Sequence, residues 1–169
     1  GAPVRSRAKV DQAKSLFSGQ FVQPLYNFFW VPIVPDIAGF QIYGGKEEAY
    51  MLKDLVQASR SYRRFDHHAP VSIKILEELV ELARLCPSAA NRQPLRFILS
   101  TAPADNEAIF ACLKWAAYLT DWDGPAPAER PSAYIVMINT AKEWEFARFD
   151  LGIMAQTMLL GAAEKGLGG

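Results

Sequence analysis

The chain has 169 residues, half of them hydrophobic, which is enough for one globular domain of ordinary size with a buried core. Eighteen basic and eighteen acidic residues cancel, so no overall field favours nucleic acid or an anionic membrane, and any basic site must be local. Cys86 and Cys112 have neither CxxC nor zinc-ligand spacing and are too few for a disulfide scaffold. The default is therefore a reduced, cytoplasmic protein.

The chain divides near Met51, and residues 1–50 are expected to form an aromatic, proline-rich extension of unknown role. Residues 15–35 carry no charge and approach the length of a membrane span, but Pro24 and Pro32 would break the helix that a bilayer requires. The apolar run also comes late for a signal peptide and has no clear small-residue cleavage site. We expect its aromatic side chains to pack on the domain or on a second subunit.

Two helices are predicted in the first part of the remaining domain, residues 51–169. The first is an amphipathic helix that delivers Ser59 and Arg60 at its end, and its inward residues are Met51, Leu52, Leu55 and Val56. The second begins at the N-cap Ser72 and is stopped by Pro87, with a core-facing set of Ile75, Leu76, Leu79, Val80 and Ala83.

Strands and helices alternate in the second half of the chain. Residues 97–99 predict a short buried strand and residues 133–138 the clearest strand, with a third helix capped by Asp105 between them. A last helix, about residues 143–165, is apolar almost all round, so we expect it to be buried on most sides and to end at a glycine C-cap. This order predicts an α+β fold, a three-layer αβα sandwich, with that helix at the centre of a domain or a dimer.

Two polar motifs stand out from this pattern. The first is Ala-Ser-Arg-Ser-Tyr-Arg-Arg-Phe at residues 58–65, in which Arg60, Ser61 and Arg63 could bind a phosphate through charge-assisted hydrogen bonds. The second is Pro-Ser-Ala-Ala-Asn-Arg-Gln-Pro at residues 87–94, in which the planar amide of Asn91 suits the edge of a heterocycle. Together they predict a site for a flat, anionic, hydrogen-bonding ligand.

The pair resembles the flavin-binding signature of the nitroreductase family of FMN-dependent oxidoreductases. The resemblance covers residues 51–169 and includes the segment Leu-Lys-Trp-Ala at 113–116, Asp-Trp-Asp-Gly-Pro at 121–125, and the helix that starts with Asp-Leu-Gly at 150–152 and ends in Gly-Leu-Gly at 166–168. It implies a homodimer with two FMN molecules at the subunit interface and NAD(P)H as the co-substrate. The implied cofactor-binding residues are Arg60, Ser61, Tyr62 and Arg63 at the phosphate, and Pro87, Ser88, Ala89, Asn91 and Gln93 along the flavin.

Two features depart from the family pattern. Ser59 stands where the family often has the first arginine of an Arg-Arg-Ser motif, which would weaken or remove one phosphate contact. The sequence also ends at Gly169, whereas family members continue through a segment facing flavin N5 and a late basic residue near the phosphate. We therefore expect the natural protein to be longer, or those roles to be empty or supplied from elsewhere.

Several residues have simpler interpretations. An arginine cluster alone is usually a solvated surface, Asn91 could only cap a turn, and Arg92 and Gln93 could only hold their loop. Trp115 and Trp122 are expected to be packing aromatics. We expect no catalytic role for His67 and His68. We expect the two cysteines to be inert core thiols rather than nucleophiles.

The sequence thus predicts an FMN-dependent oxidoreductase that uses NAD(P)H to reduce nitroaromatic, quinone or related acceptors. No catalytic side chain and no metal site are expected, since the flavin would carry the chemistry. The alternatives are a flavin-binding or dimerisation module without turnover, and a family relative that carries out reductive dehalogenation or flavin breakdown.

Overall fold

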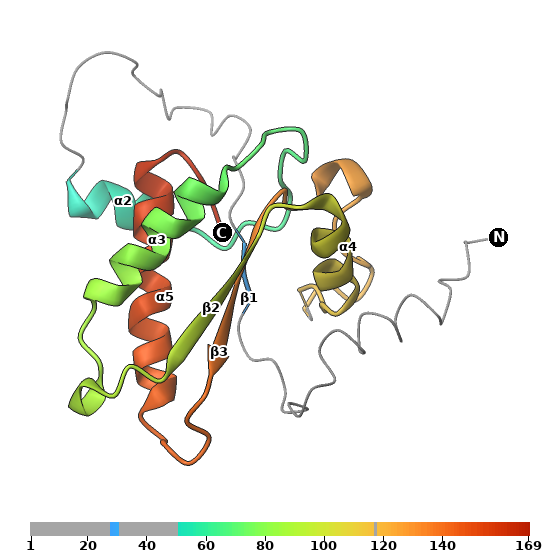
Figure 1. Ribbon diagram of the computed structural model, residues 1–169. Helices are drawn as coiled ribbons and strands as arrows, with labels where there is room; N and C mark the ends of the chain where they lie inside the picture. Colours follow the sequence, from blue (N-terminus) through green and yellow to red (C-terminus); the bar gives the residue numbers. More distant parts are fainter. Residues whose placement is uncertain (1–27, 31–50, 117) are drawn as a thin grey trace.

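A computed structural model describes residues 28–30, 51–116 and 118–169, the first of these ranges by its backbone only (Figure 1). The described helices and strands follow one another in the order β1 (Phe28–Trp30), α2 (Leu52–Ala58), α3 (Ile73–Leu85), β2 (Leu95–Ser100), α4 (Pro103–Ala111), β3 (Tyr134–Asn139) and α5 (Ala147–Glu164). Short 3₁₀ helices lie at Ala89–Asn91 and Pro127–Glu129. The mixture of helices with a small sheet confirms the predicted α+β class.

The sheet is antiparallel, with β3 between β1 and β2. Leu95 pairs with Asn139 and Ser100 with Tyr134, so the whole of β2 lies along β3. Because side chains alternate across a strand, the register decides which residues of β3 reach each side of the sheet.

Both faces of β3 are covered by helices. Ile135 and Met137 pack into the main core with α3 and α5, whereas Tyr134 and Val136 pack against Ile109 of α4. Figure 1 shows α3 and α5 on one side of the sheet and α4 on the other. The strand is therefore buried on both faces, as a continuous apolar run predicts, and the arrangement confirms the three-layer αβα expectation.

Local signals in the sequence correctly place both ends of α3. Ser72 is the N-cap, and its side chain accepts a hydrogen bond from the Ile75 N–H at 3.4 Å. The helix ends at Leu85 because Cys86 precedes Pro87, a position that disfavours helical backbone. The end of α5 is also as predicted, since Gly166 has a φ of 71° and donates its N–H to the Ala163 carbonyl.

Other boundaries differ from the prediction. Strand β2 spans six residues and alternates in exposure, with Ile98 39% exposed, so it is a half-buried edge strand rather than a short buried one. Asp105 does not cap α4, because Pro103 occupies the first turn and Ala102 is the N-cap. Helix α5 begins at Ala147 rather than near residue 143, since a turn precedes it.

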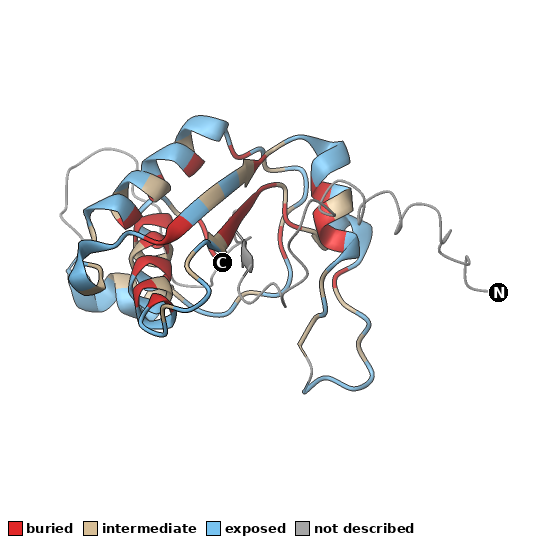
Figure 2. Cartoon of the chain, turned by 60° about the horizontal axis from the view of Figure 1, so that its bottom comes forward, coloured by how far each residue is buried: buried red, intermediate tan, exposed pale blue. Residues whose placement is uncertain are grey.

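The predicted inward face of α2 is exposed, and one side of α5 is exposed as well. Helix α2 has no buried residue, and Met51 and Leu52 are 71% and 66% exposed. Most residues of α5 are buried or half-buried, as expected, and its exposed apolar residues Phe149 and Ile153 (61% and 42% exposed) lie on one side of the helix. Figure 2 shows buried residues concentrated where α5 and β3 face each other, with exposed residues on the outer helices.

The expectation that the cysteines are core thiols is wrong for Cys112, which is exposed, whereas Cys86 is half-buried. Apart from the pairing of β1 with β3, the expected packing of residues 1–50 lies outside the described residues. None of the helices in the described ranges is long and apolar enough to cross a membrane.

Two leucines of α3 test how the core is built. Leu79 has no exposed surface and Leu85 is 66% exposed. We expect Leu79→Ala to lower the free energy of unfolding by about 2–5 kcal/mol, because it leaves a cavity between α3 and α5, and Leu85→Ala to lower it by less than about 1 kcal/mol. Urea denaturation followed by circular dichroism measures both, and equal losses would contradict the assigned packing.

Candidate functional site

The first polar motif follows α2 and lies against the C-terminal end of α5. The Tyr62 N–H donates to the Gly169 carbonyl at 3.3 Å, and the Tyr62 hydroxyl donates to the Ala58 carbonyl at 2.8 Å. Burial raises the pKa of the Tyr62 phenol above its usual value, and the neighbouring Arg60 charge opposes that rise. Tyr62 therefore fastens the motif to the domain and leaves its neighbours facing solvent.

The three arginines of this motif have different surroundings. Arg64 forms an ion pair with Glu129 at 2.9 Å and lies 5.9 Å from the centre of the Trp122 ring. Arg63 donates to the Ser61 carbonyl at 3.0 Å. Arg60 is exposed and forms no ion pair with a described carboxylate. Arg60 and Arg63 are thus the cations left for an anionic ligand.

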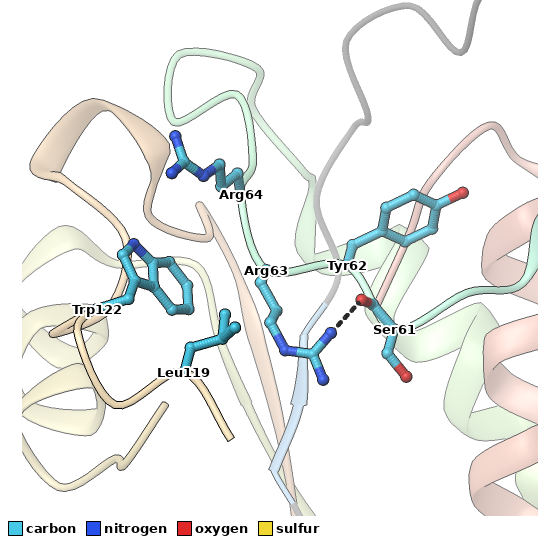
Figure 3. Close-up of a pocket in the computed structure, with 6 residues that line it drawn as sticks. All are labelled: Ser61, Tyr62, Arg63, Arg64, Leu119 and Trp122. Carbon is cyan, nitrogen blue, oxygen red and sulfur yellow. Dashed lines mark hydrogen bonds between the residues drawn. The ribbon is translucent and has the colours of Figure 1, made fainter. Parts of the chain in front are cut away.

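A shallow cavity of about 530 Å³ lies beside this motif (Figure 3). One wall consists of residues 61–64, and the other is contributed by Leu119 and Trp122 from the connection between α4 and β3. In Figure 3 the Arg63 side chain lies between Ser61 and the Leu119–Trp122 wall. Cations, a hydroxyl and an aromatic ring on one surface can accommodate an anion with an apolar portion.

The second motif is a tightly folded loop between α3 and β2. Ala90, Asn91 and Gln93 have φ values of 52°, 51° and 47°, which is the left-handed region that non-glycine residues rarely adopt. Inside the loop, Ser88 Oγ accepts the Gln93 N–H at 3.3 Å, and Gln93 Nε2 donates to Asn91 Oδ1 at 2.9 Å. The loop therefore has a defined shape that presents its amides on the surface.

Two residues of the α5 region hold this loop, and sequence reasoning assigned a role to neither. Asp150 is 1% exposed, and its Oδ1 accepts the Ala89 N–H at 2.8 Å. The Arg92 guanidinium lies 4.0 Å from the centre of the Trp144 ring, so Arg92 helps to hold the loop, as one of its interpretations supposed. The sequence feature that could have identified Asp150 is a carboxylate within the largely apolar sequence of α5.

A single chain does not bring the two motifs together. The second motif is tied to Asp150, in the first turn of α5, and the first motif is tied to Gly169, just beyond its last turn. The 18 residues of α5 span about 27 Å, and Figure 1 shows the two connections at opposite ends of this helix. Any ligand that touches both motifs within one chain must extend along most of α5.

The remaining candidates have packing or surface positions. Trp115 and Trp122 form an edge-on pair with ring centres 6.3 Å apart, as expected of packing aromatics. His67 and His68 are exposed. Cys86 lies next to the second motif and hydrogen-bonds Thr157 Oγ1 at 3.1 Å.

Comparison with known proteins identifies the family. The family model described as "Nitroreductase family" matches residues 56–169, well over half of the chain. An oxygen-insensitive NADPH nitroreductase of Helicobacter acinonychis (strain Sheeba) is 43% identical over 49 residues, which is 29% of this chain and 23% of the relative. The match therefore spans under a quarter of that protein's length. The family match covers both polar motifs and confirms the resemblance predicted from them, and the chain belongs to the nitroreductase family.

Proposed function

We propose that the protein is an FMN-dependent oxidoreductase that uses NAD(P)H to reduce nitroaromatic, quinone or related acceptors, with residues 51–169 as its FMN-binding domain. The observation that carries this proposal is the exposed pair Arg60 and Arg63 beside Ser61, at the start of a domain matched to the nitroreductase family. The name of the Helicobacter relative supports NADPH as a reductant and a nitro compound as an acceptor.

The residues present fit the two ends of FMN. Arg60, Ser61 and Arg63 offer two cations and a hydroxyl to a terminal phosphate, and all three are exposed. Asn91 and Gln93 offer amide donors and acceptors to the edge of the flavin ring, with Pro87, Ser88 and Ala89 shaping the loop around them. Tyr62 acts through its backbone and its hydroxyl by holding the phosphate motif in place.

The chemistry that bound FMN supplies is acceptance of a hydride from NAD(P)H and transfer of electrons to the acceptor. This chain's contribution is to bind and orient, so no described side chain is required as a nucleophile or acid. A module that only binds flavin or only dimerises would have the same residues but would not catalyse turnover. Release of halide from a halogenated acceptor would indicate the alternative of reductive dehalogenation, and loss of the flavin itself would indicate flavin breakdown.

A homodimer resolves the separation of the two motifs. A two-fold axis perpendicular to α5 would pack the helix antiparallel to its copy. The N-terminal end of α5 in one copy would then lie beside the C-terminal end of α5 in the other. Phe149 and Ile153 offer an apolar surface for this contact, and Gly152 between them has open space where a Cβ would lie. Each FMN would then be bound by Arg60, Ser61 and Arg63 of one copy and by the loop at 87–94 of the other.

The exposed apolar residues of α2 support the same assembly. Met51, Leu52 and Val56 would lose contact with water in a dimer that covers them. Two free cysteines are compatible with a reducing cytoplasmic compartment, which is part of the proposal.

The purified protein is expected to bind FMN rather than FAD, because two cations beside Ser61 fit a terminal monophosphate. Flavin released by denaturation is identified by chromatography, and the absorbance of bound flavin is followed after NADPH is added without oxygen. Bleaching by NADPH followed by recovery on addition of a nitroaromatic supports turnover. Recovery of FAD, or no binding of added FMN, would refute the cofactor, whereas binding without bleaching would favour the module.

Replacement of the free arginines should weaken FMN binding without unfolding the domain. Arg60→Ala or Arg63→Ala removes a charge-assisted contact worth about 1.5–3 kcal/mol, which corresponds to roughly a tenfold to hundredfold increase in Kd. Turnover should largely return at saturating FMN, since these residues contact the phosphate rather than the ring. Flavin fluorescence titration and steady-state rates measure the two effects.

Arg64→Ala and Arg84→Ala are matched controls for this experiment. Arg64 is adjacent in sequence but paired with Glu129, and Arg84 is paired with Glu81 on α3. Both should change the Kd less than Arg60→Ala or Arg63→Ala. Unchanged FMN affinity in Arg60→Ala and Arg63→Ala would show that the phosphate lies elsewhere.

Mixing two defective variants tests whether the site spans two copies. An Arg60→Ala, Arg63→Ala double variant and an Asn91→Ala variant are each expected to have low activity at limiting FMN. If they are unfolded and refolded together, about half of the dimers contain both chains and one of their two sites is intact, so about one quarter of wild-type activity should return. Each variant unfolded and refolded alone is the control. If the mixed sample recovers no activity, each site lies within one chain.

A further inference from the structure

Asp150 is a buried carboxylate to which the proposed function assigns no role. It lies in the first turn of α5, is 1% exposed, and uses one oxygen, Oδ1, to accept the Ala89 N–H at 2.8 Å. Its other oxygen, Oδ2, is buried and has no hydrogen-bond partner in the described part of the chain. A carboxylate in such a place costs stability, because burial removes its hydration and only one hydrogen bond replaces it.

The loop that Asp150 contacts is strained. Ala90 and Asn91, which directly follow the bonded amide, are both left-handed, and Gln93 is left-handed as well. Side chains with a Cβ disfavour this backbone, so it persists only where the surroundings determine it. A fixed contact just before Ala90 is therefore placed where the chain must leave the extended conformation of Ser88.

The loop's internal hydrogen bonds do not attach it to the rest of the domain. Ser88 Oγ and Asn91 Oδ1 both bond to Gln93, so they close the loop on itself. Thr140 attaches the end of the loop, because its N–H and its Oγ1 donate to the Pro94 carbonyl at 3.0 and 2.7 Å. The residues before Pro94 are oriented from α5 and the turn before it: Asp150 holds their first part, and Trp144 lies against Arg92. Arg92 is exposed, so of these two contacts only the one to Asp150 is shielded from water.

We propose that Asp150 is a positioning residue, whose buried carboxylate holds the loop at residues 87–94 in its left-handed shape so that Asn91 and Gln93 are preformed for the ligand. The inference rests on the proposed FMN site and adds a residue to it. An asparagine could accept the same hydrogen bond without burying a charge. A carboxylate that is ionised accepts a hydrogen bond from a backbone N–H more strongly than a neutral amide does.

The test compares Asp150→Ala, Asp150→Asn and a control, Asp105→Asn, in the full chain. Asp105 also lies in the first turn of a helix but is exposed on α4. Hydrogen exchange measures the loop without any flavin. In Asp150→Ala the amide of Ala89 should exchange roughly tenfold faster or more, with a smaller increase in Asp150→Asn, while amides of β3 and those of the control are unchanged.

FMN titration and the spectrum of the bound flavin measure the consequence for the site. If the loop without its anchor holds the competent shape about one tenth of the time, the Kd for FMN rises about tenfold in Asp150→Ala. Asp150→Asn should recover part of this affinity. At saturating FMN the visible absorption bands of the bound flavin should differ from wild type in Asp150→Ala, which a residue that only stabilises the fold would not cause.

The outcomes separate this inference from the proposed function. If loop exchange is unchanged in Asp150→Ala, Asp150 does not hold the loop and the inference is overturned. If the loop amides exchange faster but the affinity for FMN is unchanged, Asp150 holds the loop without contributing to FMN binding, and that part of the inference is overturned. Faster loop exchange in a protein whose wild type binds no FMN refutes the cofactor but supports the role of Asp150 in the loop. If Asp150→Ala does not fold, the nearly isosteric Asp150→Asn is used for the same comparisons of loop hydrogen exchange and FMN affinity with wild type.

Discussion

The close approach of α5 to α3 determines where both polar motifs lie. Gly161 of α5 faces Leu79 and Leu82 of α3, and a Cβ at this position would overlap the Leu82 side chain. The absence of a side chain lets the two helices pack closely, although glycine lowers the intrinsic stability of a helix. With α5 held in this way against α3 and β3, its two ends become fixed points on the domain, and each motif is tied to one of them.

The two ends of α5 differ in how firmly the neighbouring polar side chains are held. At the last turn, Arg60 and Arg63 are exposed side chains that can adjust to a charged group, because long cationic side chains retain many rotamers. At the first turn, the loop is held by a buried carboxylate and by left-handed backbone. An adjustable cationic end suits a phosphate, which is symmetric and tolerant of geometry. A fixed amide end suits a flat ring with donors and acceptors in set positions.

The sequence predicted the features that depend on neighbouring residues. Ser72 and Pro87 mark the ends of α3 through local hydrogen bonding and sterics, and the apolar run at 134–139 forms the central strand. It failed for Ile98 and for Met51 and Leu52, because periodicity reveals that a face is apolar and not what covers it. The separation of the motifs along α5 and the bond from Asp150 to Ala89 depend on contacts between distant parts of the chain, and no local pattern encodes them.

Charge also explains how the chain can lack the first arginine of the family motif. Ser59 is the C-cap of α2 and donates its N–H to the Leu55 carbonyl at 2.8 Å. Because Glu129 neutralises Arg64, Arg60 and Arg63 remain as two free positive charges. A phosphate monoester carries about −1.5 to −2 charges near neutral pH, so two cations balance it. A third unpaired arginine would add mutual repulsion on this surface, and Ser61 instead contributes a neutral donor.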